Sequence, residues 1–263
     1  MARFCSLFSS SCGNSTYIGS GGGGLLIDAG VSAKQISLKL DCIGVSPADI
    51  GAIFITHEHS DHVKGLRVFA SKNKIPIYAT EGTLNALVAA KVIELTADLH
   101  VIGAEGTEVC GHLVKPFETS HDVAESCGYT VETEDGTRLA VATDTGIVTD
   151  AMRNALLGCD LVMIESNHDI GMVRNNPNYP YMLKRRILSD VGHLSNGACS
   201  EFVTELVENG TTRLVLGHLS KENNIPGLAY QTSRAALECA GACESRDYIL
   251  KVAGGAEPET VVL

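Results

Sequence analysis

The sequence has no long apolar run and few positive charges, and each absence excludes a class of protein. No stretch of about 18 apolar residues occurs, so no transmembrane helix is expected. The amino terminus lacks the apolar stretch of a secretory signal, and we therefore expect a cytoplasmic protein without a membrane partner. The net charge of -11 argues against a protein that coats nucleic acid nonspecifically, because such binding depends on Lys and Arg. It does not exclude a nuclease, in which bound divalent metals supply local positive charge.

Cysteine pairs with the spacing of a zinc or redox site are also missing. The nine cysteines stand singly and no Cys-x-x-Cys occurs. This predicts reduced, mostly buried thiols rather than disulfides or a thiolate metal site. The glycine run at residues 21–24 is not followed by Gly-Lys-Ser/Thr, so we interpret it as a hairpin turn and not as a phosphate loop.

The apolar content indicates one large globular core. Of the 263 residues, 44% are hydrophobic and no linker-like segment divides them, so we expect a single domain over residues 1–263. Short apolar runs alternate with helical periodicity, which predicts an α/β fold. The expected strands are residues 25–27, 52–55, 75–78, 139–142, 161–164 and 214–216. The expected helices are residues 63–70, 84–92, 152–157 and 202–206, and Asp-Gly at 135–136 predicts a hairpin turn.

Polar side chains directly follow four of the expected strands. They are Thr56-His57, Thr143-Asp144, Glu165-Ser166 and Gly217-His218. Because α/β proteins place their sites where strands end, we expect these residues at one edge of a sheet.

The densest group of possible metal ligands is Thr56-His57-Glu58-His59-Ser60-Asp61-His62. Three imidazoles and a carboxylate beside a buried strand would be costly to fold if nothing bound them. On an extended segment His57 and His59 point to the same side and can hold one ion. Asp61 and His62 enter a helix and turn toward a second ion. Two ions about 3.5 to 4 Å apart would hold a bridging water for attack on a phosphoester; a solvated histidine-rich loop is the alternative.

The spacing His57-x-His59-x-Asp61-His62 resembles the signature of the metallo-β-lactamase fold superfamily. His121, in Glu-Thr-Ser-His-Asp, and Asp144, in Ala-Thr-Asp-Thr-Gly, match later motifs of that superfamily in order. The resemblance covers nearly the whole chain. It implies the αββα four-layer sandwich of that fold, within the α/β class.

Three further segments look like the WalJ/YycJ (VicX) branch of the superfamily, which is related to ribonuclease Z and the phosphodiesterase PhnP. They are residues 9–15 (Ser-Ser-Ser-Cys-Gly-Asn-Ser), 165–169 (Glu-Ser-Asn-His-Asp) and 192–196 (Gly-His-Leu-Ser-Asn). This resemblance implies a manganese-dependent hydrolase that degrades DNA from 5′ to 3′, and a metal-bridging hydroxide as its nucleophile.

The same resemblance implies two divalent metal ions and assigns their ligands. One ion is held by His57, His59 and His121, and the other by Asp61, His62 and His218. The Asp144 carboxylate bridges the two ions. A site made of nitrogen and oxygen ligands leaves manganese, zinc and iron open.

The tetrapeptide Gly-His-Leu-Ser occurs twice, with His193 and with His218. His218 ends an apolar strand, which favours a metal ligand. His193 precedes the cap of a helix, where backbone amides attract anions. We therefore expect His193 to contact the scissile phosphate and to protonate the leaving oxygen, with Glu165 orienting its ring. The expected catalytic residues are thus Asp61, His193 and Glu165.

The stretch from Ile170 to Ser189 contains four basic residues and no acidic one. The cations and the interleaved tyrosines are Arg174, Lys184, Arg185 and Arg186, with Tyr179 and Tyr181. Such a pattern is typical of a channel for single-stranded DNA, in which cations follow the phosphates and rings stack on bases. An ordinary loop and a helix with solvated cations are the alternative.

The expected substrate contacts lie in three parts of the sequence: Asn14, Asn167, His168, Arg185 and Arg186. Two histidines, His100 and His112, match no motif, and we expect them at the surface.

Two other functions fit the same motifs. One is hydrolysis of a small ester, a lactone or a cyclic phosphodiester, and the other is a metal-loaded regulatory protein without turnover. The turn at His193, its partner Glu165 and the basic stretch favour attack at phosphorus. The complete ligand set argues against a protein without turnover. Single-stranded or 5′-ended DNA is therefore the expected partner.

Overall fold

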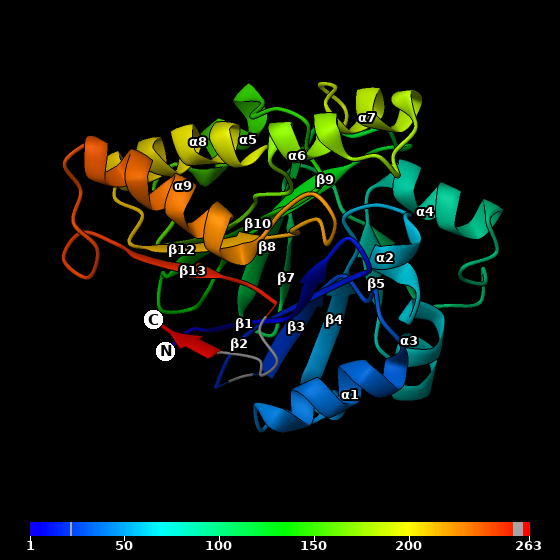
Figure 1. Ribbon diagram of the computed structural model, residues 1–263. Helices are drawn as coiled ribbons and strands as arrows, with labels where there is room; N and C mark the ends of the chain where they lie inside the picture. The colour runs from blue at the N-terminus through cyan, green and yellow to red at the C-terminus, as the bar shows by residue number, and fades with distance from the viewer. Residues whose placement is uncertain (22, 255–259) are drawn as a thin grey trace. The chain divides into compact units, whose positions relative to one another are not determined.

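A computed structural model describes residues 1–21, 23–254 and 260–263 (Figure 1). The chain divides into two compact units, and each is described by itself. The first contains Met1–Pro116, Val123–Thr137 and Gly254–Leu263, and the second contains Phe117–Asp122 and Arg138–Ala253. The expectation of a single domain stays a prediction.

The first unit is built on a sheet with the strand order β14-β1-β2-β3-β4-β5-β6. Its strands are β1 (Arg3–Ser10), β2 (Gly13–Ser20), β3 (Gly23–Ile27), β4 (Ile50–Phe54), β5 (Ile77–Ala79), β6 (Leu99–Val101) and β14 (Thr260–Val262). Neighbouring strands in the series β14, β1, β2, β3 are antiparallel, and neighbouring strands in the series β3, β4, β5, β6 are parallel. Ser20 pairs with Gly23, which confirms the hairpin expected here, although Gly22 lies outside the described residues.

The helices of the first unit cover this sheet. They are α1 (Ala33–Cys42), α2 (Ser60–Val63), α3 (Leu66–Asn73) and α4 (Glu81–Ala89), with a 3-10 turn η1 (Pro47–Asp49). The apolar faces of α1, α3 and α4 pack against sheet residues such as Leu26, Ile53 and Ile77 (Figure 1). The helix expected over residues 63–70 is interrupted at Gly65, between α2 and α3.

The first unit also holds β7 (Thr107–Val109), β8 (His112–Glu118) as far as Pro116, and β9 (Cys127–Glu132). β7 and β8 pair antiparallel. After β9, Gly136 has a φ of +78° and its amide donates to the Thr133 carbonyl oxygen over 2.8 Å. This confirms the expected Asp-Gly turn.

The second unit contains four parallel strands in the order β13-β12-β11-β10. They are β10 (Arg138–Ala142), β11 (Leu161–Glu165), β12 (Arg213–Gly217) and β13 (Ile249–Val252). Ala142 pairs with Ile164, and Ile164 pairs with Leu216. Because these three strands end at the same level, the residues that follow them leave from one edge of the sheet. The expected common edge is thereby confirmed for Asp144, Glu165 and His218. It is wrong for Thr56 and His57, which follow β4 in the sheet of the first unit.

Five helices accompany these strands. They are α5 (Asp150–Leu156), α6 (Ile170–Asn175), α7 (Tyr181–Ile187), α8 (Asn196–Glu208) and α9 (Pro226–Cys239). The apolar faces of α5, α8 and α9 pack on the strands around Val162, Ile164 and Leu214 (Figure 1). Across both units, each expected strand and helix overlaps an observed one.

All nine cysteines are free thiols, but the expectation that most of them are buried is wrong. Four are buried and four are exposed: Cys5, Cys127, Cys159 and Cys199, and Cys12, Cys42, Cys239 and Cys243. Cys42 and Cys239 end helices α1 and α9, where side chains reach solvent. Over the described ranges, no helix is both long enough and apolar enough to cross a membrane.

Candidate metal centre

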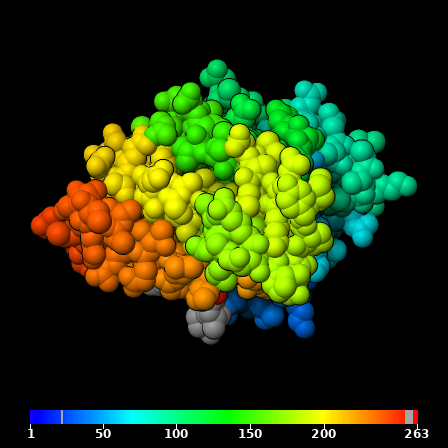
Figure 2. Space-filling view, turned by 45° about the horizontal axis from the view of Figure 1, so that its top comes forward, coloured from blue at the N-terminus to red at the C-terminus, as the bar shows by residue number. Residues whose placement is uncertain are grey.

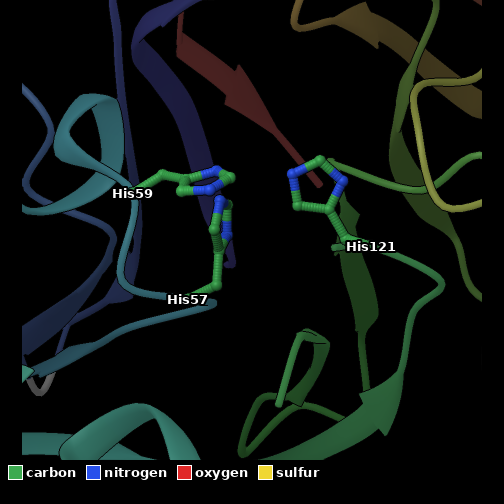
Figure 3. A group of neighbouring side chains, drawn as sticks. All are labelled: His57, His59 and His121. Carbon is green, nitrogen blue, oxygen red and sulfur yellow. The ribbon is translucent and has the colours of Figure 1, made fainter. Parts of the chain in front are cut away.

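The first cluster of candidate ligands lies in the first unit, on the segment between β4 and α2. The His57 and His59 rings lie edge to face with centroids 4.8 Å apart (Figure 3). The centroids of the His57 and His62 rings are 4.1 Å apart. His62 Nε2 lies 3.6 Å from the Asp61 carboxylate. His57 and His62 are buried, whereas the Asp61 side chain is 22% exposed. The four expected ligands of this segment therefore form one compact group.

Thr56 and Asp28, the second of which the sequence did not reveal, hold this group in place. The Asp28 carboxylate accepts hydrogen bonds from the Thr56 amide over 2.9 Å and from His62 Nδ1 over 2.7 Å. The Thr56 hydroxyl lies 3.0 Å from His57 Nδ1. Because Nδ1 is engaged in both rings, Nε2 is the candidate ligand atom of each. Asp28 directly follows the apolar strand β3, the same signal that identified Asp144.

Asn14 belongs to the same cluster. Its Nδ2 lies 3.0 Å from His62 Nε2 and 3.4 Å from Asp61 Oδ2, and the residue is 5% exposed. Gly30 permits this close packing, because a Cβ there would collide with the Asp61 carbonyl oxygen. These contacts favour a role for Asn14 in positioning Asp61 and His62. The expected contact with substrate stays a prediction.

The second cluster lies in the second unit, where strands end and α8 begins. One ligand atom from each of Asp144, Glu165, His193 and His218 lies within 4.8 Å of the others. Asp144 Oδ1 is 3.4 Å from His218 Nε2 and 3.9 Å from His121 Nε2. Asp144 and His218 have φ values of +57° and +53°, in the left-handed region that residues with a Cβ rarely adopt. The backbone thus turns sharply at the end of β10 and of β12, where these two side chains begin.

The half-buried His193 and the buried Glu165 form a pair within this cluster. His193 Nδ1 lies 2.7 Å from Glu165 Oε1, and Glu165 Oε2 accepts a hydrogen bond from the Thr145 amide over 2.9 Å. Burial is the largest influence on the His193 pKa and lowers it, but the carboxylates of Glu165 and Asp144 together outweigh burial and raise this pKa to about 9. The pair with Glu165 thus favours the protonated imidazole. With Nδ1 held by Glu165, Nε2 is the atom that can donate a proton to a substrate.

Buried asparagines join the loops that follow β11, precede α8 and follow β12. Asn224 Nδ2 donates to the carbonyl oxygens of Ser166 and Asn167 over 2.8 and 3.0 Å. Its Oδ1 accepts from Asn196 Nδ2 over 2.9 Å. Asn167 Nδ2 donates to the His218 carbonyl oxygen over 2.9 Å. Asn224 was not identified from the sequence, because hydrogen bonds between loops follow no spacing that marks an asparagine.

Asn167 and His168 lie in the interior. They are 4% and 1% exposed, and burial lowers the pKa of His168 to about 4. The His168 carbonyl oxygen accepts from the Asn196 amide over 2.9 Å. The hydrogen bond to His218 favours a positioning role for Asn167. The contacts with substrate that we expected of both residues stay predictions.

Arg185 and Arg186 on α7 have different surroundings. The Arg186 guanidinium makes two hydrogen bonds to the Asp122 carboxylate, of 2.5 and 2.8 Å. This pairing lowers the pKa of Asp122 and raises that of Arg186. Asp122 follows His121, whose Nδ1 lies 3.0 Å from the Gly192 carbonyl oxygen, so Nε2 is the candidate ligand atom of His121 (Figure 3). Arg185 is exposed.

The two histidines outside the motifs differ. His100 is 44% exposed, which confirms its expected place at the surface. The same expectation for His112 is wrong, because this residue is fully buried and burial lowers its pKa. His112 begins β8 opposite Val109 of β7, and the strand turns its side chain inward. Residue type alone could not show this.

Comparison with known proteins identifies the family. The chain matches the beta-lactamase superfamily domain over residues 24–219. It is 37% identical over 237 residues to exodeoxyribonuclease YycJ of Bacillus anthracis, which covers 90% of this chain and 89% of that protein. It is 39% identical over 233 residues to exodeoxyribonuclease WalJ of Streptococcus pneumoniae serotype 2, which covers 88% of this chain and 86% of that protein.

Solved structures agree on the fold. YhfI, a metallo-β-lactamase fold protein from Bacillus subtilis, has a TM-score of 0.74 at 13% identity and covers 100% of both chains. A diphosphatase of the PhnP family has a TM-score of 0.66 at 19% identity and covers 99% of this chain and 97% of that chain. By sequence, the chain is also similar to ribonuclease Z of Pyrobaculum islandicum, with 28% identity over 51% of this chain and 44% of that protein. The expected α/β class, metallo-β-lactamase fold and wider relatives are confirmed. The chain therefore belongs to the beta-lactamase superfamily and, within it, to the family of the exodeoxyribonucleases YycJ and WalJ.

Proposed function

We propose that this chain is a metal-dependent exodeoxyribonuclease that degrades DNA from its 5′ end. Relatives of 37% and 39% identity over about nine tenths of the chain are exodeoxyribonucleases. The observation in the chain itself that carries the proposal is the 2.7 Å contact of His193 with Glu165, beside Asp144. A protonated imidazole next to candidate metal ligands suits cleavage of a phosphodiester, because the leaving oxygen needs a proton.

We further propose that the two clusters supply the ligands of two divalent metal ions. The donors are imidazole nitrogens and carboxylate oxygens, which suit manganese or zinc and also iron. The proposed ligands are those assigned from the motifs: His57, His59, Asp61, His62, His121, Asp144 and His218. Oxygen atoms hold Nδ1 of His57, His62 and His121, as is usual for metal-binding histidines. When bound, the ions supply Lewis acidity that lowers the pKa of water and offsets phosphate charge.

The chain's own residues then orient the reacting groups and move a proton. Glu165 fixes the His193 ring, and His193 holds the proton for the leaving oxygen on Nε2. Asp61 and His62 are held together by Asn14, whose Nδ2 contacts both side chains. The Asp28 carboxylate fixes the orientation of the His62 ring.

We propose single-stranded or 5′-ended DNA as the partner and the cytoplasm as the location. Four cations without a carboxylate between Ile170 and Ser189, in a chain of net charge -11, support the first. Nine free thiols support the second, because the cytoplasm keeps cysteines reduced.

The test follows the full chain with Mn²⁺ on 5′-phosphorylated single-stranded DNA labelled at its 3′ end. We expect the labelled strand to shorten progressively, and a chelator or His62→Ala to stop this. His100→Ala makes the same chemical change at an exposed histidine and should leave the rate unchanged. Intact DNA, together with turnover of a lactone by the same preparation, would contradict the proposal and favour hydrolysis at carbon.

A further inference from the structure

Helix α7 is a short helix that its own unit does not use for packing. None of its residues is buried. Tyr181 and Met182 are 72% and 69% exposed, although burial of such side chains is favourable. In Figure 2 the yellow-green segment that contains α6 and α7 lies on the surface facing the viewer. A helix that presents an aromatic and a thioether side chain to solvent calls for an explanation other than the core.

The exposed side chains of α7 are arranged together. The Arg185 guanidinium lies over the Tyr181 ring, 6.0 Å from its centroid. The two residues are four positions apart and therefore share one face of the helix. In the described part of the chain, Arg185 forms no ion pair with a carboxylate. One face of α7 thus combines a flat ring with a positive charge that no protein carboxylate offsets.

Two of the other three cations of this stretch, Lys184 and Arg186, are engaged by the protein. Arg186 is bonded to Asp122, and Lys184 Nζ donates to the Arg174 carbonyl oxygen over 2.8 Å. Arg186 therefore stabilises the loop that carries His121. Of the two arginines expected to contact substrate, only Arg185 is placed to do so.

The end of α7 touches the loop that carries His193. The His193 amide donates to the Ile187 carbonyl oxygen over 3.1 Å, and a Cβ at Gly192 would collide with that oxygen. Six residues of helix separate Ile187 from Tyr181, roughly 9 Å at about 1.5 Å per residue. Stacked nucleotides rise by about 3.4 Å each, so the length of helix between Tyr181 and Ile187 corresponds to about two to three nucleotides.

From this arrangement we infer that Tyr181 and Arg185 form a platform for the single-stranded DNA that enters the active site. The Tyr181 ring stacks on a base and the Arg185 guanidinium contacts a backbone phosphate. The inference rests on the proposed nuclease function and names the part of the chain that holds the substrate strand. It predicts little base preference, because every base offers a face for stacking.

The test measures binding of a nuclease-resistant phosphorothioate DNA strand of roughly 12 nucleotides, within the range of single-strand sites, to the Mn²⁺-loaded full chain. We expect Tyr181→Ala to weaken binding about tenfold and Tyr181→Phe to leave it unchanged, because stacking needs the ring and not the hydroxyl. Arg185→Ala should lower the slope of log K against log salt by about 0.7, the value for one phosphate contact on a single strand.

Arg246→Ala is the matched control, since it removes an exposed positive charge that is paired with Asp247 elsewhere on the unit. It should leave the salt slope unchanged, as should Arg185→Lys. Arg246→Ala should also hydrolyse bis(p-nitrophenyl) phosphate at the rate of the unaltered protein. Loss of this activity in Tyr181→Ala would overturn the inference by showing damage to the site itself.

Two outcomes separate the inference from the function on which it rests. If the unaltered protein shortens DNA but Tyr181→Ala and Arg185→Ala bind it equally well, the platform is overturned and the nuclease stands. If the unaltered protein neither binds nor shortens DNA, both are overturned. An RNA strand of the same sequence that binds as tightly as DNA would overturn the choice of DNA.

Discussion

The two clusters of candidate ligands differ in how the chain builds them. In the first unit four candidate ligands come from residues 57–62, and the Asp28 carboxylate holds His62 and the Thr56 backbone beside them. In the second unit the functional residues come from separate loops between residues 121 and 218 and are joined by buried asparagines. We therefore expect the first cluster to depend on a few charged contacts, and the second to depend on the fold of its unit.

The largest effect should come from the two histidines of the repeated Gly-His-Leu-Ser turn. His218→Ala removes a proposed ligand and should lower the manganese content by one ion and kcat/KM by on the order of 10³-fold. His193→Ala should keep the full metal content and lower kcat by about 10² to 10⁴-fold, the range for a lost proton donor. Elemental analysis and rate measurements check both variants. If His193→Ala loses an ion and His218→Ala does not, His193 is the metal ligand and His218 is the proton donor.

A smaller effect is expected when the support of the first cluster is removed. Asp28→Asn deletes the charge that faces His62 Nδ1, while asparagine tolerates the φ of +64° at this position. Metal affinity should fall about 10- to 100-fold, as for other carboxylates that orient a ligand histidine. Activation by added Mn²⁺ measures this. Asp41→Asn, at an exposed carboxylate on α1, should leave the affinity for Mn²⁺ unchanged. Equal affinities of the two variants would show that Asp28 does not support the metal ligands.

Loss of the asparagine that supports the second cluster should lower the stability of the protein. Asn224→Ala removes the buried hydrogen-bond partner of the Ser166 and Asn167 carbonyl oxygens and of the Asn196 side-chain Nδ2. The free energy of unfolding should fall by about 2 kcal/mol, the usual cost of such losses, in a urea titration. Asn154→Ala on the exposed face of α5 is the control and should be neutral. If Asn224→Ala has the same free energy of unfolding as the unaltered protein, the loops hold their shape without Asn224.

The sequence predicted the first cluster well because its ligands are neighbours along the chain. The spacing of His57, His59, Asp61 and His62 marked it, and the family resemblance that started from this spacing is confirmed. Asp144 was found because polar residues after buried strands meet at a sheet edge. The ligand set as a whole stays a prediction.

The supporting residues were missed for physical reasons. Asn224 forms hydrogen bonds with Asn196 and Ser166, which lie 28 and 58 positions before it in the sequence. Hydrogen bonds between loops follow no local periodicity. Asp28 is different, since it follows β3 directly and the strand-end rule would have found it. His112 was misplaced because polarity suggests solvent, whereas its strand faces inward.

Asp28, Asp144 and His218 all have positive φ values, of +64°, +57° and +53°. Glycine adopts this conformation more easily because it has no Cβ. Selection for heat resistance alone would therefore favour glycine at the ends of β3, β10 and β12, where these side chains begin. Variants recovered from such a selection would lack two proposed metal ligands, Asp144 and His218, and the Asp28 carboxylate that accepts from His62 Nδ1. Screens for robust forms of this enzyme must consequently score turnover in every round.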